Sequence, residues 1–255
     1  MNATHLTTRA VALAGISLLT AVACGTAAPT GISDAKALIS SCTGPVNTYI
    51  AIDGTASGDI SALDGPRRRA ITNELSQVAA CGGRAKAVVF SSSSAATMTL
   101  FEGGIALSGA TDQSRARRLS GAVDEVVNRI SSAFDAAVPS LDHSGSDPVA
   151  QMRLFHEWTG QVGVGKPRML ELTDGFQNVG IGTEQIVADP AAAAARFAVP
   201  DLTGTEVTVA GVGEMSGSAP STEVVDALKS FYAALCQHAG AARCAVITEA
   251  AGAVS

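Results

Sequence analysis

Short apolar runs alternate with amphipathic helical segments through most of this chain, and this alternation restricts the fold more than any other feature. The runs are VNTYIAID, RAKAVVF, ATMTLFE, RMLELTDG, EVTVAGVG and RCAVITEA. Between them lie segments with apolar residues at helical spacing, the longest from about Asp112 to Val138 and ended by Pro139. Strands that alternate with helices are typical of a parallel sheet covered by helices on both faces. The sequence therefore predicts an α/β fold with a doubly wound, mostly parallel sheet flanked by helices.

The composition is that of a folded domain with an acidic surface. Hydrophobic residues make up 47% of the 255 residues and charged residues only 16%, which is enough apolar material for a sizeable core. The formal net charge is −6. Nucleic acids are recognised through basic patches that neutralise phosphates, so a nucleic-acid partner is not expected.

The first 23 residues have the pattern of a secretion signal and are not expected to belong to the fold. A short polar start with Arg9 precedes an apolar run that is too short to span a bilayer as a mature helix. The run ends in AVAC, which resembles the bacterial lipobox, in which small residues precede a cysteine that is lipidated. The prediction is lipidation of Cys24; a plain secretory signal cleaved a few residues later is the alternative.

This interpretation divides the chain into three parts. Residues 1–23 are the signal peptide, residues 24–40 the lipid anchor and a flexible tether, and residues 41–255 the folded domain. The expected location is the extracytoplasmic face of the cell membrane, reached through the lipid anchor.

The cysteine count agrees with export to an oxidising compartment. Five cysteines are an awkward odd number there, but assigning Cys24 to lipid leaves an even set: Cys42, Cys81, Cys236 and Cys244. None of the four has C-x-x-C spacing, so neither a zinc site nor a thioredoxin-type site is indicated.

The predicted topology places these four cysteines near one edge of the sheet, where they allow three connectivities. Helices of a doubly wound sheet run opposite to its strands, so helix ends and strand starts share one edge. Cys42 precedes the first strand and Cys81 ends the first helix, whereas Cys236 ends the last helix and Cys244 begins the last strand. We therefore predict the sequentially local disulfides Cys42–Cys81 and Cys236–Cys244.

Polar side chains follow two of the predicted strands at the point where each strand ends. In YIAIDGTASGD, Asp53, Thr55 and Ser57 occupy alternate positions, and Asp174 ends another strand. Ligands of doubly wound sheets bind at the carboxyl ends of the strands. Carboxylate and hydroxyl oxygens suit a hard divalent cation, Mg²⁺ first and Mn²⁺ or Ca²⁺ as alternatives. The competing interpretation is that Asp53 and Thr55 only cap the next helix.

These motifs resemble the von Willebrand factor A (vWA) domain family. DGTAS is similar to the D-x-S-x-S sequence of its metal-ion-dependent adhesion site, and LELTDG to the fourth strand, which provides Asp174. HSGSDPVAQM stands where the family has a third loop, with Ser146 in place of the usual threonine; Thr111 in GATD is a competing candidate. The resemblance extends from about Val46 to Ala250 and includes extracellular A-domain proteins of actinobacteria.

The resemblance implies a binding site for a protein ligand and no enzymatic activity. A divalent cation would be held by Asp53, Thr55, Ser57, Ser146 and Asp174, with one position open for a carboxylate of an unidentified protein partner. One alternative is an accessory or structural protein of the envelope in which the metal site is vestigial. The other is a metal-dependent phosphoesterase, for which no nucleophile is found.

Two further motifs imitate catalytic sequences. AIDGT is similar to the phosphatase motif D-x-D-G-T, but Ala51 occupies the position of the nucleophile. GQVGVGKP imitates a phosphate-binding loop, but Pro167 replaces the hydroxyl residue that would bind Mg²⁺. Neither motif supports an enzyme.

Overall fold

The computed structural model describes residues 27–55, 63 and 65–251. The strands are β1 (Val46–Asp53), β2 (Ala85–Phe90), β3 (Met98–Gly103), β4 (Lys166–Leu172), β5 (Glu206–Ala210) and β6 (Arg243–Ile247). The helices are α1 (Ile32–Ser41), α2 (Gly65–Cys81), α3 (Asp112–Ala137), α4 (Val149–Val162), α5 (Thr183–Ala188), α6 (Pro190–Ala194) and α7 (Thr222–His238). Short 3-10 turns precede β3 and follow α3.

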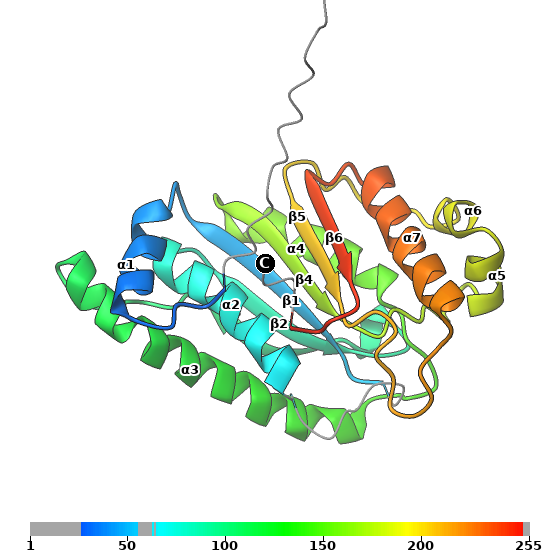
Figure 1. The fold of residues 1–255 in the computed structure, drawn as a ribbon, viewed down its shortest axis with the longest axis horizontal. Helices are drawn as coiled ribbons and strands as arrows, with labels where there is room; N and C mark the ends of the chain where they lie inside the picture. The colour runs from blue at the N-terminus through cyan, green and yellow to red at the C-terminus, as the bar shows by residue number, and fades with distance from the viewer. Residues whose placement is uncertain (1–26, 56–62, 64, 252–255) are drawn as a thin grey trace, which may run out of the picture.

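The strands form one six-stranded sheet in the order β3-β2-β1-β4-β5-β6 (Figure 1). Neighbouring strands are parallel except β2 and β3, which are antiparallel. This is the order of a doubly wound sheet, and it confirms the predicted fold class. The chain reverses its direction of growth between β1 and β4, where Ile52 pairs with Leu172. This junction is the topological switch point, at which such sheets bind their ligands.

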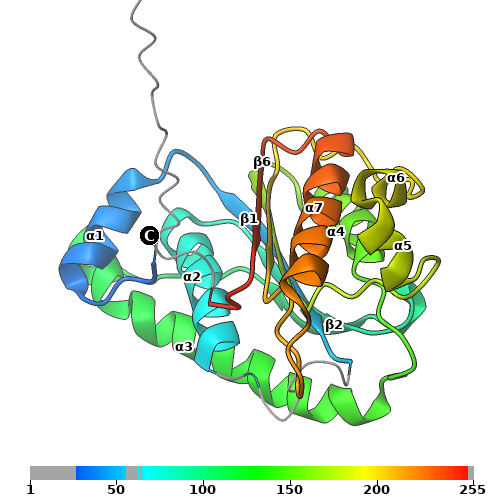
Figure 2. The ribbon, with the colours of Figure 1, turned by 45° about the vertical axis from the view of Figure 1, so that its right-hand side comes forward.

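Helices cover both faces of the sheet. Helices α1, α2 and α3 lie over one face, and α4 to α7 lie on the other (Figures 1 and 2). Strand β1 is buried along its whole length and divides its side chains between the two layers. Ile50 and Ile52 belong to the first core, and Tyr49 and Ala51 to the second. A central strand enclosed on both sides explains why VNTYIAID has no polar–apolar alternation.

The predicted boundary between tether and domain at residue 41 is wrong. Residues 32–41 form helix α1, which buries Ala35, Leu38 and Ile39 against the first core. The chain is already attached before this helix, because the Ala28 backbone N–H donates to the Asn73 side chain of α2 at 2.7 Å. The folded domain thus begins well before residue 41. Because residues from Ala28 onward contact it, the expected tether is shorter than predicted.

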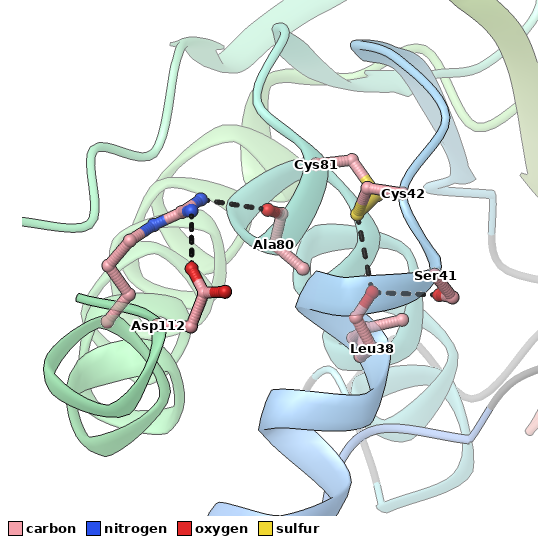
Figure 3. The surroundings of a disulfide bond; sticks show 7 residues. Leu38, Ser41, Cys42, Ala80, Cys81 and Asp112 are labelled. Atoms are coloured by element: carbon pink, nitrogen blue, oxygen red, sulfur yellow. Dashed lines mark hydrogen bonds and ion pairs between the residues drawn. A yellow bond between two sulfur atoms is a disulfide. The ribbon is translucent and has the colours of Figure 1, made fainter.

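Both disulfides join the pairs of cysteines that the sequence predicts. Cys42–Cys81 links the end of α1 to the end of α2 (Figure 3), and Cys236–Cys244 links α7 to the start of β6. Both lie where the parallel strands begin, which we call the amino edge of the sheet. The opposite edge, where β1 and β4 end, is called the carboxyl edge.

Near the amino edge, an arginine forms ion pairs with a helix and with a neighbouring strand. Arg168 on β4 donates two hydrogen bonds to Glu74 of α2, at 2.9 and 2.8 Å, and a further one to Glu206 of β5. Arg168 therefore ties a helix and two strands together near the disulfides.

Cys24 and the segment predicted to be a signal peptide lie outside the described residues. Within the part of the chain that the structure describes, no helix has the length and apolarity needed to cross a membrane.

Candidate functional site

The site begins with the turn that follows β1. Asp53 is the last residue of the strand, and the backbone N–H of Gly54 donates to the Phe90 carbonyl of β2 at 2.9 Å. A side chain at Gly54 would collide with Leu141 and Val89. Glycine therefore lets the chain leave the sheet close to its neighbours, with the Asp53 carboxylate at the carboxyl edge.

Three hydroxyl groups converge on the Asp53 carboxylate. Oδ1 accepts hydrogen bonds from the Thr55 backbone N–H at 3.0 Å and from the Thr55 hydroxyl at 2.7 Å. Oδ2 accepts from the hydroxyls of Ser146 and Thr173, both at 2.8 Å. Asp53 is only 5% exposed, so these bonds replace most of the solvation of its charge.

Two neighbouring segments hold Ser146 in place. Its backbone N–H donates to the Asn178 side chain at 2.6 Å, and its carbonyl accepts from the Asn178 N–H at 3.2 Å. The next N–H, of Asp147, donates to the Ser91 carbonyl at the end of β2 at 3.0 Å. The Ser146 loop is thus fixed between β2 and the segment after β4.

Thr173 joins Asp53 to the turn that carries Asp174. While its hydroxyl donates to Asp53, the same oxygen accepts the Gly175 N–H at 3.0 Å. Gly175 has a φ of 86°, a conformation that favours glycine, and the Phe176 N–H donates to Asp174 at 3.0 Å. Asp174 is 2% exposed. Its position after β4 places it at the same edge as Asp53.

The structure brings together most of the residues predicted for the metal site. Asp53, Thr55 and Ser146 are in direct contact, and Asp174 follows the strand that pairs with β1. Ser57 lies outside the described residues.

Thr111, the competing candidate for the third loop, lies at the other edge of the sheet. Its hydroxyl caps α3 by accepting the Ser114 N–H at 3.2 Å. One turn into α3, Arg115 donates to the Ala80 carbonyl, beside the Cys42–Cys81 disulfide (Figure 3). Ser146 is therefore the third-loop residue that meets Asp53.

Sequence reasoning missed Thr173 and Asn178. Thr173 directly precedes Asp174 and has the same kind of side chain as Thr55, so its hydroxyl was a visible signal. Asn178 carried no such signal, because its role depends on the path of the loop after β4.

Negative charge is concentrated beneath the site. The hydroxyl of Tyr232 on α7 donates to the Gly175 carbonyl at 3.1 Å. Burial raises the pKa of Tyr232 well above its ordinary value, and the charges of Glu171, Asp174, Asp53 and Asp147 raise it further. Four acidic groups thus act on one buried phenol, an environment that a bound cation would stabilise.

The donor set fits a hard cation only if hydroxyl oxygens take part. No three His, Cys, Asp or Glu side chains among the described residues gather in an arrangement that could hold a metal ion. The oxygens of Thr55 and Ser146 lie beside the carboxylate of Asp53, and a mixture of hydroxyl, carboxylate and water ligands is suited to Mg²⁺.

Comparison with known proteins gives distant structural neighbours. No family model matches the sequence, and no curated protein matches it. The conserved hypothetical protein BatB from Bacteroides thetaiotaomicron is 16% identical, with a TM-score of 0.40, and the match covers 80% of this chain and 90% of that one. An aerotolerance-related membrane protein from Bacteroides fragilis NCTC 9343 is 18% identical, with a TM-score of 0.38 and the same coverage.

A third neighbour is the pilus adhesin SpaC from Lactobacillus rhamnosus GG in its open conformation. It is 13% identical with a TM-score of 0.40, and the match covers 74% of this chain and 27% of the adhesin. At these values the strand order, and not the neighbours, defines the fold of this chain.

Proposed function

We propose that this chain is a vWA-like binding domain, anchored by lipid on Cys24 at the extracytoplasmic face of the cell membrane. It binds a protein ligand through a divalent cation at the carboxyl edge. The observation that carries the proposal is the convergence of the Thr55, Ser146 and Thr173 hydroxyls on Asp53 at the switch point of the sheet.

The hydrogen bonds give each hydroxyl a defined direction. The hydroxyls of Thr55 and Ser146 both donate to Asp53, which places two hydroxyl oxygens beside a carboxylate, and this is a donor set that suits a hard cation. Thr55 and Ser146, together with Ser57, are therefore the direct ligands in this proposal, and Asp53 and Asp174 complete the site directly or through water. Mg²⁺ is the preferred cation, with Mn²⁺ or Ca²⁺ as alternatives. One remaining position accepts a carboxylate of the partner.

The side chains around Asp53 favour binding over catalysis. The hydrogen bonds that Asp53 accepts from the described residues come from hydroxyl and backbone groups, and none comes from a histidine, cysteine or lysine side chain. A phosphoesterase needs a nucleophile activated by a base or a metal-bound water with a proton acceptor. We therefore prefer the binding role to the phosphoesterase alternative.

Thermal melting in the presence of cations tests the proposal. A cation that binds only the folded state stabilises it by about 2.7 kcal/mol at a concentration one hundred times its Kd. The melting temperature of the EDTA-treated protein should therefore rise by several degrees with Mg²⁺ or Mn²⁺. Asp53→Ala should abolish this rise.

Asp201 provides a matched control. Its carboxylate accepts the Thr203 N–H at 2.9 Å and the Thr203 hydroxyl at 2.7 Å, which reproduces the local Asp53–Thr55 turn at an exposed position. Asp201→Ala should leave the response to cations intact. If neither cation changes the melting of the wild type, the hydroxyls only satisfy a buried carboxylate and the site is vestigial.

The anchor has its own test. Cys24→Ala should release the protein from the membrane fraction or block its processing. A mature N-terminus beyond Cys24, found unmodified by mass spectrometry, would contradict the anchor.

A further inference from the structure

Glu171 is a carboxyl group buried in the middle of the sheet. It lies on β4 between Ala51 of β1 and Val209 of β5, with no exposed surface. Neither of its side-chain oxygens has a hydrogen-bond partner among the described residues. A charged carboxylate in such a position costs several kcal/mol unless it is paired.

The groups that act on Glu171 do not offset this cost. The nearby phenols are Tyr49 on β1 and Tyr232 on α7, and both titrate at higher pH because Glu171 and burial oppose their ionisation. The charged groups acting on Glu171 are Asp53 and Asp147, both acidic. Burial first, and then these two charges, raise the pKa of Glu171 well above its ordinary value. Glu171 therefore holds a proton where an ordinary glutamate is charged.

Glu171 lies directly behind the candidate cation site. Thr173 directly follows β4, and its N–H still donates to the Ala210 carbonyl of β5 at 3.0 Å, so it continues the alternation of the strand and lies on the same side of the sheet as Glu171. Thr173 in turn donates to Asp53. A cation bound at the carboxyl edge would offset the negative charge of Asp53, which is one of the two charges that oppose ionisation of Glu171.

We propose that binding of a divalent cation at the carboxyl edge is coupled to release of the proton held by Glu171. When a divalent cation occupies the carboxyl edge, the O–H bond of Glu171 breaks, the proton passes to the solvent, and the remaining carboxylate adds its charge to the field that holds the cation. This inference rests on the proposed function. Because linkage is reciprocal, acidification weakens cation binding by the same coupling.

Calorimetric titration of the mature protein with Mn²⁺ and Mg²⁺ tests the exchange. Titrations in two buffers of different ionisation enthalpy, over a series of pH values, count the protons released for each cation bound. The wild type should release protons, and its affinity should rise with pH by on the order of tenfold, equivalent to a coupling of one pKa unit. In Glu171→Gln the release should disappear and the pH dependence should flatten.

Two further variants complete the test. Glu157→Gln removes a half-exposed acid from α4 on the same side of the sheet and should keep the wild-type proton release. Glu171→Leu replaces the acid with an apolar side chain that needs no partner, so it should fold even if the glutamine variant does not, and it should release no proton.

The outcomes separate the exchange from the binding function. Cation binding without proton release by the wild type overturns the exchange alone, as does proton release that persists in Glu171→Gln or Glu171→Leu. If the wild type binds neither cation at any pH, the proposed function is wrong and the exchange falls with it.

Discussion

The two edges of the sheet are built from different interactions. At the amino edge, one disulfide joins α1 to α2, the other joins α7 to β6, and the paired guanidinium of Arg168 connects α2 with β4 and β5. At the carboxyl edge, the described residues are joined by hydrogen bonds among buried hydroxyls, carboxylates and backbone groups. Covalent links restrict the unfolded chain, whereas the polar network at the carboxyl edge concentrates negative charge in one place.

This difference indicates a division of roles between the two edges. Buried acidic groups that are close together oppose folding, so the carboxyl edge is a costly arrangement in the absence of a cation. The cross-links of the amino edge supply stability at a distance from the site, which allows the carboxyl edge to keep side chains suited to binding. Changes at the amino edge should therefore alter stability alone, and changes at the carboxyl edge should alter stability and cation binding together.

The largest effect is expected from the disulfide Cys42–Cys81. Replacing both cysteines with serine should lower the free energy of unfolding by about 4 kcal/mol, because the bond closes a loop with a sequence separation of 39. The second disulfide has a separation of 8, so its removal should cost about 2.5 kcal/mol. Urea unfolding measures both losses. If either variant showed a smaller rise in melting temperature with cations, the proposed division of roles between the two edges would be wrong.

Thr173→Val should have the next largest effect. It removes a hydroxyl that donates to Asp53 and accepts from the Gly175 N–H, and a buried group left unpaired costs about 1–3 kcal/mol. Stability and cation affinity should both fall, as measured by urea unfolding and cation titration. Thr203→Val removes a hydroxyl that donates to the exposed carboxylate of Asp201, in the position that Thr55 has beside Asp53, and serves as the control for loss of a threonine–aspartate hydrogen bond. Equal losses in the two variants would mean that the Asp53 network has no special role.

The pair Ser146→Ala and Thr111→Ala compares the edges directly. Thr111→Ala removes the N-cap of α3 and should cost about 1 kcal/mol without changing the response to cations. Ser146→Ala should reduce the rise in melting temperature caused by Mg²⁺ or Mn²⁺. The opposite pattern, with cation binding lost in Thr111→Ala alone, would show that Ser146 is not a ligand.

The smallest effect concerns pH, and its sign differs between two glutamates. Although burial alone would raise the pKa of Glu206, the hydrogen bond from Lys166 and the charge of Arg168 lower it. A lowered pKa in the folded state stabilises the protein above the ordinary carboxyl pKa, and this stability is lost as the pH falls. The raised pKa of Glu171 acts in the opposite direction, so its stabilising effect is lost as the pH rises.

Urea unfolding at several pH values distinguishes these two contributions. Glu206→Gln should flatten the acid side of the stability profile by at most about 1 kcal/mol, since its ion pairs are partly exposed. Glu171→Gln should remove the fall in stability that begins as the pH rises above the ordinary pKa of a glutamate. If one variant removed both the loss of stability at low pH and the loss at higher pH, the two edges would not be independent.

The sequence predicted the fold well because its strands and helices have distinct periodicities. The buried run ending in Asp53 and the strand ending before Asp174 could be recognised locally, and the rule for parallel sheets placed both at one edge. Ser146 could be selected over Thr111 from the order of the elements.

Other features depend on tertiary structure and were missed. The tether predicted for residues 24–40 contains most of helix α1, whose Ala35, Leu38 and Ile39 have helical spacing and are buried against the first core. Glu171 lies within an apolar run, and nothing local indicates that both of its oxygens are enclosed without partners. The D-x-T pattern is equally ambiguous, since Asp201 and Thr203 form the same turn at an exposed position.

The contact between Ala28 and Asn73 limits how far the domain can stand from a membrane. If Cys24 carries the lipid, only four residue steps (28 − 24) separate it from this contact, a reach of about 14 Å at full extension. Asn73 lies in the middle of α2, which covers one face of the sheet, so this contact lies over that face and at neither edge. A lipid on Cys24 would hold this helical face near the bilayer, and a partner of the carboxyl edge would then approach from the side of the domain.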